Sequence, residues 1–240
     1  HVDHFIFPEY ERMRFVLGEI PKQPDVRASI IYNVARYNPA AKPVPTADRE
    51  KAILYAGTLT SDTTLALEFL EEPLSRLPIH IYGNFSGHDA GDLRVAFLAH
   101  QNNKNGLRYE GYVPGVQLRA RIPRYAFSFV RWNPASGMNF HFACPNKFFE
   151  AIAYGVPPIS APHPQCADII RRFNCGVLAE DFSAQAMYDA ASKALNMLGT
   201  AAYDTMVENC TSAYNRFLNW DAQFARFAMA LPPKEEIFNG

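Results

Sequence analysis

The residues best suited to chemistry lie in one segment, RWNPASGMNFHFACPNKFFEA, over 131–151. It is rich in polar atoms and leads into a helix predicted to begin at Pro145. A helix N-terminus offers unpaired N–H groups and about half a positive charge, which suits a diphosphate, and Lys147 adds a full charge there. Glu150 lies one turn on, where a carboxylate suits the two hydroxyls of a ribose. The alternative is an exposed Lys147–Glu150 ion pair of little energetic weight.

Two glycine turns follow predicted strands in the same way. Gly57 and Thr58 follow a strand expected over 51–57, where glycine lets the backbone come close to a ligand phosphate. Gly83 ends the next strand, where it would let a planar base approach. A plain turn between strand and helix is an equal alternative at Gly57 and the better interpretation of Gly83 taken singly.

The elements that must position these residues alternate between short apolar runs and amphipathic segments from Lys51 to about Ala179. This alternation is typical of a parallel sheet. The predicted strands are 51–57, 78–83, 107–113, 126–132, 156–161 and 175–179, and the predicted helices are 63–77, 91–101, 116–125, 145–155 and 166–174. Pro73 should bend or shorten the first of these helices, and the third should break near Pro123. In an open sheet of this kind, ligands bind beyond the carboxyl ends of the strands.

The two ends of the chain have a different pattern. From Asp181 onward the segments have a helical period without a strand signal, which predicts a helical C-terminal tail. The first 50 residues predict a strand over 3–8, a helix over 9–20 and a strand over 27–34, followed by a Pro- and Ala-rich connector over 37–48 that is a hinge or linker candidate. The fold class is therefore α/β, a Rossmann-like parallel sheet with helices on both faces.

Composition excludes several classes of protein. The 240 residues are 48% hydrophobic and 20% charged with a net charge of -1, which is typical of a globular protein and argues against a nucleic-acid binder. Apolar runs fall short of the roughly 20 residues that cross a bilayer. The seven histidines lack metal-binding spacing, and the G-x-S-x-G, G-x-x-x-x-G-K-[ST] and G-x-G-x-x-G motifs are absent. Hydrolase, P-loop and dinucleotide-binding hypotheses therefore lose their usual support.

The four cysteines show no C-x-x-C pair, which favours a reducing compartment. The chain begins at His1 without a secretory pattern, so we expect a fragment of a longer, cytoplasmic protein. A basic run would suit a phosphate or an anionic membrane surface, although a solvated helix face is the interpretation that we favour. The run consists of Arg119, Arg121, Arg124 and Arg131.

The stretch PNKFFEAIAYGVPPISA, over 145–161, resembles a motif of nucleotide-sugar-dependent glycosyltransferases of the GT-B architecture, family-four-like and also called group 1. Weaker similarities extend over about 25–230. The resemblance implies the C-terminal, donor-binding half of such an enzyme. Residues 1–40 would be a remnant of the acceptor-side domain with the linker, 41–215 the Rossmann-like nucleotide-sugar-binding domain, and 216–240 a helix that packs back toward the N-terminal part.

The resemblance also implies roles for individual residues. Glu150 would bind the donor ribose, and Lys147 and Glu150 would be the catalytic pair. The remaining donor contacts would be Ala143, Cys144 and Asn146 at the sugar and diphosphate, Gly57 and Thr58 at the phosphates, and Gly83, Gly111, Tyr112 and Val113 beside the nucleobase. Two departures stand out. Phe142 occupies the place of a second glutamate that many members have, and no basic pair follows the first strand, so Lys147 or Arg131 would supply that charge.

The implied activity is transfer of a sugar from a UDP- or GDP-linked donor, with neither a metal nor another cofactor. The acceptor would be a polysaccharide, a lipid-linked sugar or another glycan, brought by the missing N-terminal domain, and the partners would include no nucleic acid. Contact with the inner face of a membrane is a further expectation. One alternative is a sugar-nucleotide epimerase of the same build, which needs paired acids and a histidine in the cleft. The other is a non-catalytic nucleotide-sugar-binding module, which Phe142 suggests.

Overall fold

A computed structural model describes residues 4–19, 27–34, 44–100 and 106–231 of the chain. Most of the predicted hinge over 37–48 lies outside the described residues, and its described end is a single 3₁₀ turn over Thr46–Asp48. None of the helices in these four ranges combines the length and the apolar composition needed to span a bilayer.

The centre of the molecule is a six-stranded sheet in the order β5-β4-β3-β6-β7-β8, in which all neighbours are parallel. Its strands are β3 (Glu50–Ala56), β4 (Ile79–Tyr82), β5 (Arg108–Gly111), β6 (Tyr125–Val130), β7 (Pro158–Ser160) and β8 (Val177–Leu178). Along the chain, β4 and β5 are added on one side of β3, and β6, β7 and β8 are then added on its other side. The loops after β3 and β6 therefore diverge and leave a crevice at the carboxyl end of the sheet.

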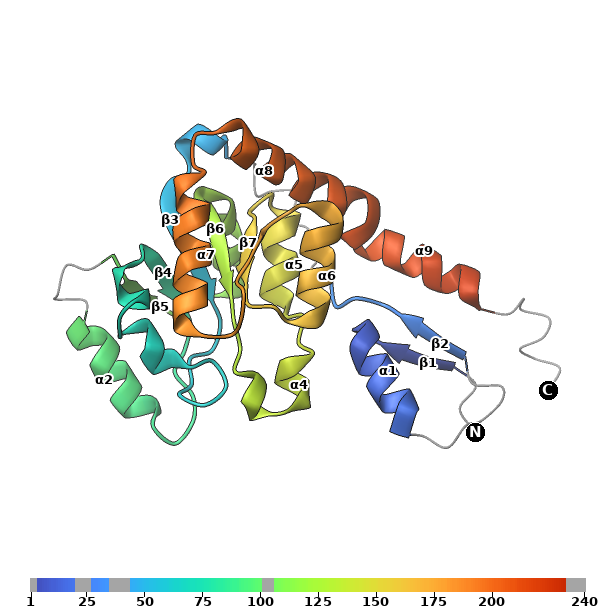
Figure 1. Cartoon of the computed structure of the whole chain (residues 1–240), viewed down its shortest axis with the longest axis horizontal. Helices are drawn as coiled ribbons and strands as arrows, with labels where there is room; N and C mark the ends of the chain where they lie inside the picture. Colours follow the sequence, from blue (N-terminus) through green and yellow to red (C-terminus); the bar gives the residue numbers. More distant parts are fainter. Residues whose placement is uncertain (1–3, 20–26, 35–43, 101–105, 232–240) are drawn as a thin grey trace.

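Helices cover both faces of this sheet, as Figure 1 shows. The α-helices of this part of the chain are α2 (Ala90–His100), α3 (Gly115–Arg121), α4 (Met138–His141), α5 (Asn146–Ala153), α6 (Pro164–Phe173), α7 (Ala184–Asn196), α8 (Ala201–Ala213) and α9 (Trp220–Ala230), of which α4 lies beyond the carboxyl end of the sheet and α9 extends away from it. Side chains of β3 alternate between two cores, since Ile53 shares a buried cluster with Met187 of α7 whereas Leu54 shares one with Ala151 of α5. This architecture confirms the predicted fold class and the helical tail.

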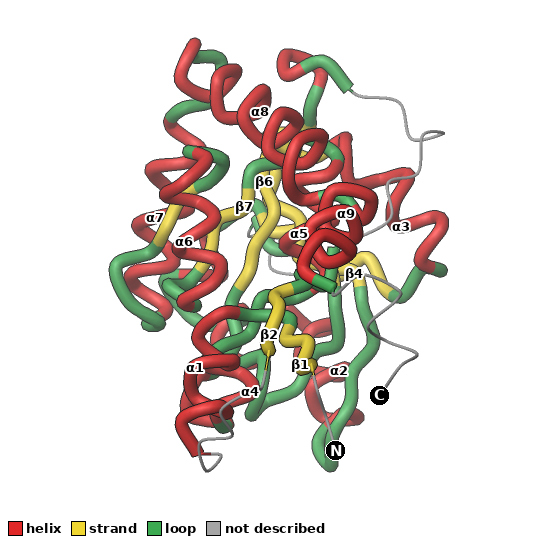
Figure 2. Tube along the Cα trace, turned by 90° about the vertical axis from the view of Figure 1, so that its right-hand side faces the viewer, coloured by secondary structure: helices red, strands yellow, loops and turns green. Residues whose placement is uncertain are grey.

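The N-terminal residues form a small parallel pair of strands, β1 (His4–Phe7) and β2 (Arg27–Ile30), joined by α1 (Tyr10–Glu19). Figures 1 and 2 place α1 beside α4 and bring α9 over β2. The Tyr32 N–H donates to Gln223 Oε1 of α9 at 3.1 Å, and the rings of Phe15 in α1 and Phe142 after α4 lie 6.1 Å apart. These contacts hold the N-terminal elements against the larger sheet.

The α-helix predicted over 63–77 is wrong. The structure has two separate 3₁₀ turns there, Ala66–Phe69 and Leu74–Arg76. The Thr60 hydroxyl accepts from the backbone N–H groups of Thr63 and Thr64 at 3.1 and 3.2 Å, and Leu65 has a left-handed φ of 51°. These hydrogen bonds to a side-chain hydroxyl stabilise a local turn in place of the first turn of a continuous α-helix. Apolar spacing alone did not reveal this competition.

Candidate functional site

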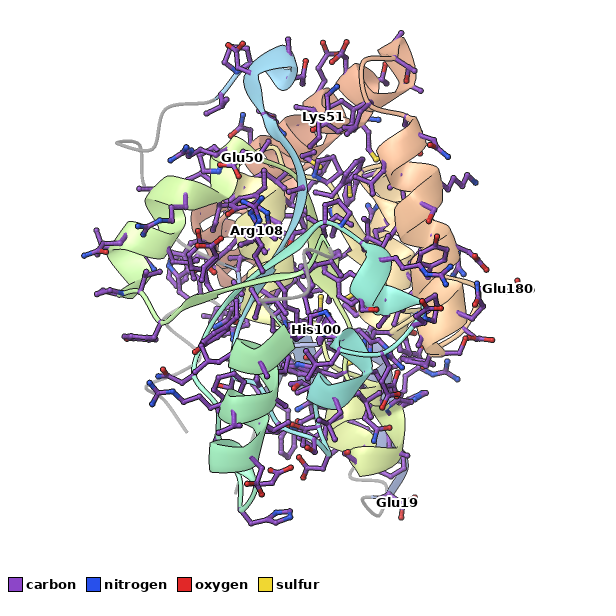
Figure 3. The ribbon with its side chains drawn as sticks, turned by 90° about the vertical axis from the view of Figure 1, so that its left-hand side faces the viewer. Glu19, Glu50, Lys51, His100, Arg108 and Glu180 are labelled. Atoms are coloured by element: carbon purple, nitrogen blue, oxygen red, sulfur yellow. The ribbon has the colours of Figure 1, made fainter. Side chains whose placement is uncertain are left out.

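A cavity of about 710 Å³ opens at the carboxyl end of the sheet, where the strand order reverses. Glu50 and Lys51 mark the other end of β3, where the strand begins, and Figure 3 shows them at the opposite end of the molecule from Glu19, the last residue of α1. The lining comes from four places: Ala56 at the end of β3 with Gly57, Thr58, Thr63 and Thr64 after it; Trp132, Asn139, Phe140 and Ala143 to Lys147 after β6, with Glu150; Pro8, Glu9, Arg12 and Asn33 from the N-terminal elements; and Leu118 of α3.

The N-terminus of α5 forms one wall of this cavity. Pro145 precedes the helix in an extended conformation, and no side chain within the described ranges caps its first turn. The amide oxygen of Asn146 instead accepts from Asn33 Nδ2 at 2.6 Å. The backbone N–H groups of Asn146 and Lys147 are therefore open to an anionic ligand.

Lys147 places its ammonium between α5 and the turn after β3. The Nζ atom lies 3.8 Å from the centroid of the Tyr55 ring, and a Cβ added to Gly57 would be 3.4 Å from it. Burial lowers the pKa of Lys147 to about 7. No carboxylate in the described part of the chain forms an ion pair with it. A ligand phosphate at the α5 N-terminus would supply the missing negative charge.

Glu150 lies one turn further along α5 and is also half-buried. Burial raises its pKa, and Arg119 of α3, with Nη1 3.8 Å from Oε1, acts in the opposite direction. The Lys147–Glu150 ion pair considered from the sequence is therefore not formed in the structure, because Glu150 faces Arg119. Its carboxylate still borders the cavity and can accept hydrogen bonds from a ligand.

Seven of the predicted donor-binding residues line the cavity: Gly57, Thr58, Ala143, Cys144, Asn146, Lys147 and Glu150. The others, at the ends of β4 and β5 and after β6, are outside the lining: Gly83, Gly111, Tyr112, Val113 and Arg131. Their assignment to a donor stays a prediction.

Gly83 has a packing role that the sequence did not reveal. A Cβ at this position would lie 1.8 Å from the Gly57 carbonyl oxygen, so the turns after β3 and β4 pack backbone against backbone. Its N–H donates to the Gly111 carbonyl at 3.0 Å, which ties β4 to β5. The absence of a side chain at Gly83 is thus required by the fold, whatever lies beside it.

Arg131 is a buried residue whose charge is already neutralised. Its Nη1 lies 2.7 Å from Glu68 Oε2, and its Nε donates to the Phe182 carbonyl at 2.9 Å. Only 4% of the residue is exposed. Of the two cations considered for the diphosphate, Lys147 is the one that borders the cavity.

Sequence reasoning missed the contribution of the N-terminal elements, namely Glu9, Arg12 and Asn33. The order of the predicted strands and helices in the sequence could have indicated this contribution. Glu9 follows β1 and Asn33 follows β2, so the rule that ligands bind beyond the carboxyl ends of parallel strands applies to this small sheet as well.

The cavity lining contains no histidine among the described residues. The structure also shows no group of three His, Cys, Asp or Glu side chains that could hold a metal ion, within the ranges that it describes. The charged side chains of the described lining are Lys147, Arg12, Glu9 and Glu150, and threonine hydroxyls and asparagine amides add further polar groups.

The fold is that of the GT-B glycosyltransferases: a parallel sheet with a cavity at its strand-order reversal, beside the N-terminus of a helix. Neither protein-family models nor curated protein sequences match the chain. Several solved structures are similar to the chain. Sucrose-phosphate synthase from Thermosynechococcus elongatus is 14% identical with a TM-score of 0.70, and the match covers 99% of this chain and 59% of that one.

Two further similar structures were solved with UDP. A TarM variant from S. aureus is 12% identical, with a TM-score of 0.65 over 98% of this chain and 43% of its own. The pneumococcal O-GlcNAc transferase GtfA, solved with UDP and GlcNAc, is 16% identical, with a TM-score of 0.62 over 100% of this chain and 46% of its own. The chain thus spans 43% to 59% of the length of these three proteins.

Proposed function

We propose that the chain is the donor-binding half of a glycosyltransferase that uses a UDP- or GDP-linked sugar. The observation that carries this proposal is Lys147, a half-buried lysine whose ammonium has no carboxylate partner in the described residues, beside the uncapped N-terminus of α5. Two positive features converge on one point of a cavity large enough for a nucleotide sugar. A diphosphate is the ligand group that satisfies both.

The mechanism follows from where charge develops. When the bond between sugar and diphosphate breaks, negative charge builds on the leaving phosphate oxygens. The N–H groups of Asn146 and Lys147 and the Lys147 ammonium are fixed in place beforehand, so they stabilise that charge without reorganisation. In this proposal the protein's own groups take the part that a metal ion plays in other transferases, and no further cofactor takes part.

Glu150 orients the nucleoside end of the donor in this proposal. Its carboxylate lies one turn into α5, on the same side of the helix as Lys147, and accepts from the ribose hydroxyls. Leu118 of α3 lines the cavity next to it and offers apolar surface to the base. The residues at the ends of β4 and β5 lie outside the cavity lining, so in this proposal they contact at most the outer edge of the base.

The acceptor would be a glycan or a lipid-linked sugar, and it would approach from the part of the enzyme that this chain does not contain. Because the similar proteins are about twice as long, we expect the chain alone to bind a donor and to turn it over poorly. A cytoplasmic location with contact to a membrane surface belongs to the same proposal.

The epimerase alternative is less well supported. It calls for paired acids together with a histidine in the cleft, and the described lining holds Glu9 and Glu150 without a histidine. The alternative of a non-catalytic binding module shares the donor site and differs only in turnover. An acceptor screen on the longer protein separates that alternative from a transferase.

Isothermal titration calorimetry of the 240-residue chain with UDP, GDP and ADP tests the proposal. We expect micromolar to millimolar affinity for at least one of these nucleotides. We also expect Lys147→Met to abolish the binding, whereas Lys51→Met, at the exposed start of β3, leaves it unchanged. A folded sample that binds none of the three nucleotides would exclude a donor site.

A further inference from the structure

Glu9 is a buried carboxylate at the cavity that the donor site described above does not use. It is 5% exposed and follows β1, far from α5 in the sequence. Even so, it lines the same cavity as Lys147 and Glu150. Burying a carboxylate is costly unless it is compensated, so its contacts show what holds it there.

Two neighbours hold the Glu9 carboxylate in place. Its Oε1 accepts from the Cys144 N–H at 3.4 Å, and Arg12 Nε lies 2.8 Å from Oε2. Arg12 is in turn fixed because its Nη2 donates to the Asn139 carbonyl at 3.3 Å. The carboxylate is therefore tied to the segment that leads into α5, although it belongs to the N-terminal elements.

These contacts leave Glu9 with unused acceptor capacity. A carboxylate can accept about four hydrogen bonds, and within the described residues Oε1 accepts only the 3.4 Å bond from the Cys144 N–H, whereas Oε2 is enclosed beside Arg12 Nε. Because Glu9 lines the cavity, a donor that enters the cavity can use the remaining acceptor capacity of Oε1. A ligand hydroxyl is a donor of the right kind.

The position of Glu9 along the cavity identifies the part of the ligand that it faces. A nucleotide sugar is a linear molecule with the nucleoside at one end, the diphosphate in the middle and the sugar at the other end. Glu150 lies inside α5, Asn146 and Lys147 form its N-terminal turn, and Cys144, which contacts Glu9, precedes the helix. With the nucleoside at Glu150 and the diphosphate at the helix N-terminus, the sugar falls beside Cys144 and Glu9.

We propose that Glu9 binds a hydroxyl of the transferred sugar and thereby selects among sugar donors. Burial raises the pKa of Glu9, and Arg12 opposes that shift and orients the carboxylate, so Arg12 acts as a positioning residue. The N-terminal elements thus contribute directly to the donor site. This inference rests on the proposed function, because it takes the donor to be a nucleotide sugar.

The test compares sugar nucleotides with their parent nucleoside diphosphates, which lack only the sugar. We would titrate the wild-type chain, Glu9→Gln and Glu9→Asp with UDP, UDP-glucose and UDP-N-acetylglucosamine, and with GDP and GDP-mannose. Glu11→Gln is the matched control, because Glu11 lies close by in α1, is more exposed and pairs with Arg14. The readout is the ratio of the affinity for a sugar nucleotide to the affinity for its parent diphosphate.

For the preferred sugar nucleotide, we expect the ratio to fall roughly tenfold or more in Glu9→Gln, since a hydrogen bond to a charged group is lost. Glu9→Asp, which keeps the charge and shortens the side chain, lowers the same ratio. Glu11→Gln leaves it unchanged, and the affinity for the parent diphosphate changes less than about twofold in all variants.

The possible failures are distinguishable. If the wild-type chain binds no nucleoside diphosphate, the proposed function fails and this inference fails with it. If the wild-type chain binds one but the ratio is the same in Glu9→Gln as in the wild type, the inference alone is overturned. Loss of folding in both Glu9 variants, measured by circular dichroism, would show a purely structural role and overturn it as well.

Discussion

Removing the Lys147 ammonium should have opposite effects on stability and on binding. In Lys147→Met the apolar part of the side chain is kept, and the charge, which lies 3.8 Å from the centroid of the Tyr55 ring, is lost. Because a partly buried cation without an anionic partner destabilises the folded state, we expect the variant to be more stable than the wild type at neutral pH. The same change should abolish nucleoside diphosphate binding.

The magnitude follows from the pKa of Lys147, which burial lowers from 10.5 to about 7. Between these two values the unfolded chain binds a proton that the folded chain does not bind, so the free energy of unfolding rises with pH there. At and below pH 7 the cost of the buried charge is roughly 5 kcal/mol for complete burial. Since Lys147 borders an open cavity, we expect about 2 kcal/mol after solvent screening.

Two assays measure this effect. Urea unfolding at pH 7 should give Lys147→Met a free energy of unfolding about 2 kcal/mol above that of the wild type, and the difference should shrink toward zero near pH 10. Calorimetry of UDP or GDP binding at pH 8 in buffers of different ionisation enthalpy should show an uptake of roughly 0.9 proton by the wild type, because the bound phosphates restore the charged form of Lys147.

The reasoning would be refuted by two results. Equal binding heats in all buffers would mean that Lys147 is already charged in the free protein or does not meet the phosphates. A Lys147→Met variant that is less stable than the wild type at pH 7 would mean that the ammonium is stabilised by partners other than a ligand. Lys51→Met, far from the cavity, is the control for both assays.

Three further predictions concern the neighbours of Lys147. Glu150→Ala should weaken UDP or GDP binding roughly tenfold in calorimetry without changing the affinity for pyrophosphate, and equal losses for both ligands would contradict a ribose contact. Because Arg119 lowers the pKa of Glu150, the loss of nucleotide affinity on acidification should begin at higher pH in Arg119→Met than in the wild type, and coincident pH profiles would count against this pairing. Gly83→Ala should lower the free energy of unfolding by about 2 to 4 kcal/mol in urea titrations, since its Cβ would meet the Gly57 carbonyl at 1.8 Å, whereas Gly91→Ala in α2, with open space around it, should not destabilise the protein.

Much of the fold could be predicted because the apolar periodicity and the residues that mark helix ends indicated the same elements. The strand predicted over 126–132 is β6, and all six of its residues are buried, as expected for a central parallel strand. Proline before α5 and Gly155 just after it marked both ends of that helix to within two residues. The motif over 145–161 begins at the N-terminus of α5, so it correctly indicated one wall of the cavity.

Local hydrogen bonding explains the main error in secondary structure. The spacing of apolar residues after Thr60 fits a helix, and the pattern of burial alone does not reveal that the Thr60 and Thr64 hydroxyls bind the backbone. A left-handed residue, Leu65, then separates this threonine turn from the following 3₁₀ turn. Such short polar networks depend on geometry that a hydrophobic pattern does not encode.

Long-range contacts account for what was missed at the site. Glu9 and Cys144 are 135 residues apart, and Arg131 meets Glu68 across 63 positions of the sequence. The spacing of residues within one segment cannot show that Arg131 is neutralised or that a carboxylate just after β1 faces the cavity. Those outcomes depend on how the segment after β1 meets the residues before α5, and on how the 3₁₀ turn Ala66–Phe69 meets the end of β6.

The hydrogen bond from Asn33 to Asn146, 2.6 Å long, joins the segment after β2 to the first residue of α5. With a donor bound at the α5 N-terminus, as proposed above, occupancy of the cavity would be thermodynamically linked to attachment of the N-terminal elements. If a ligand at the α5 N-terminus tightens that attachment, then tightening the attachment raises the affinity for the ligand by the same factor. A change on the far side of β2 that loosens these elements would accordingly weaken binding without altering a single atom that touches the ligand.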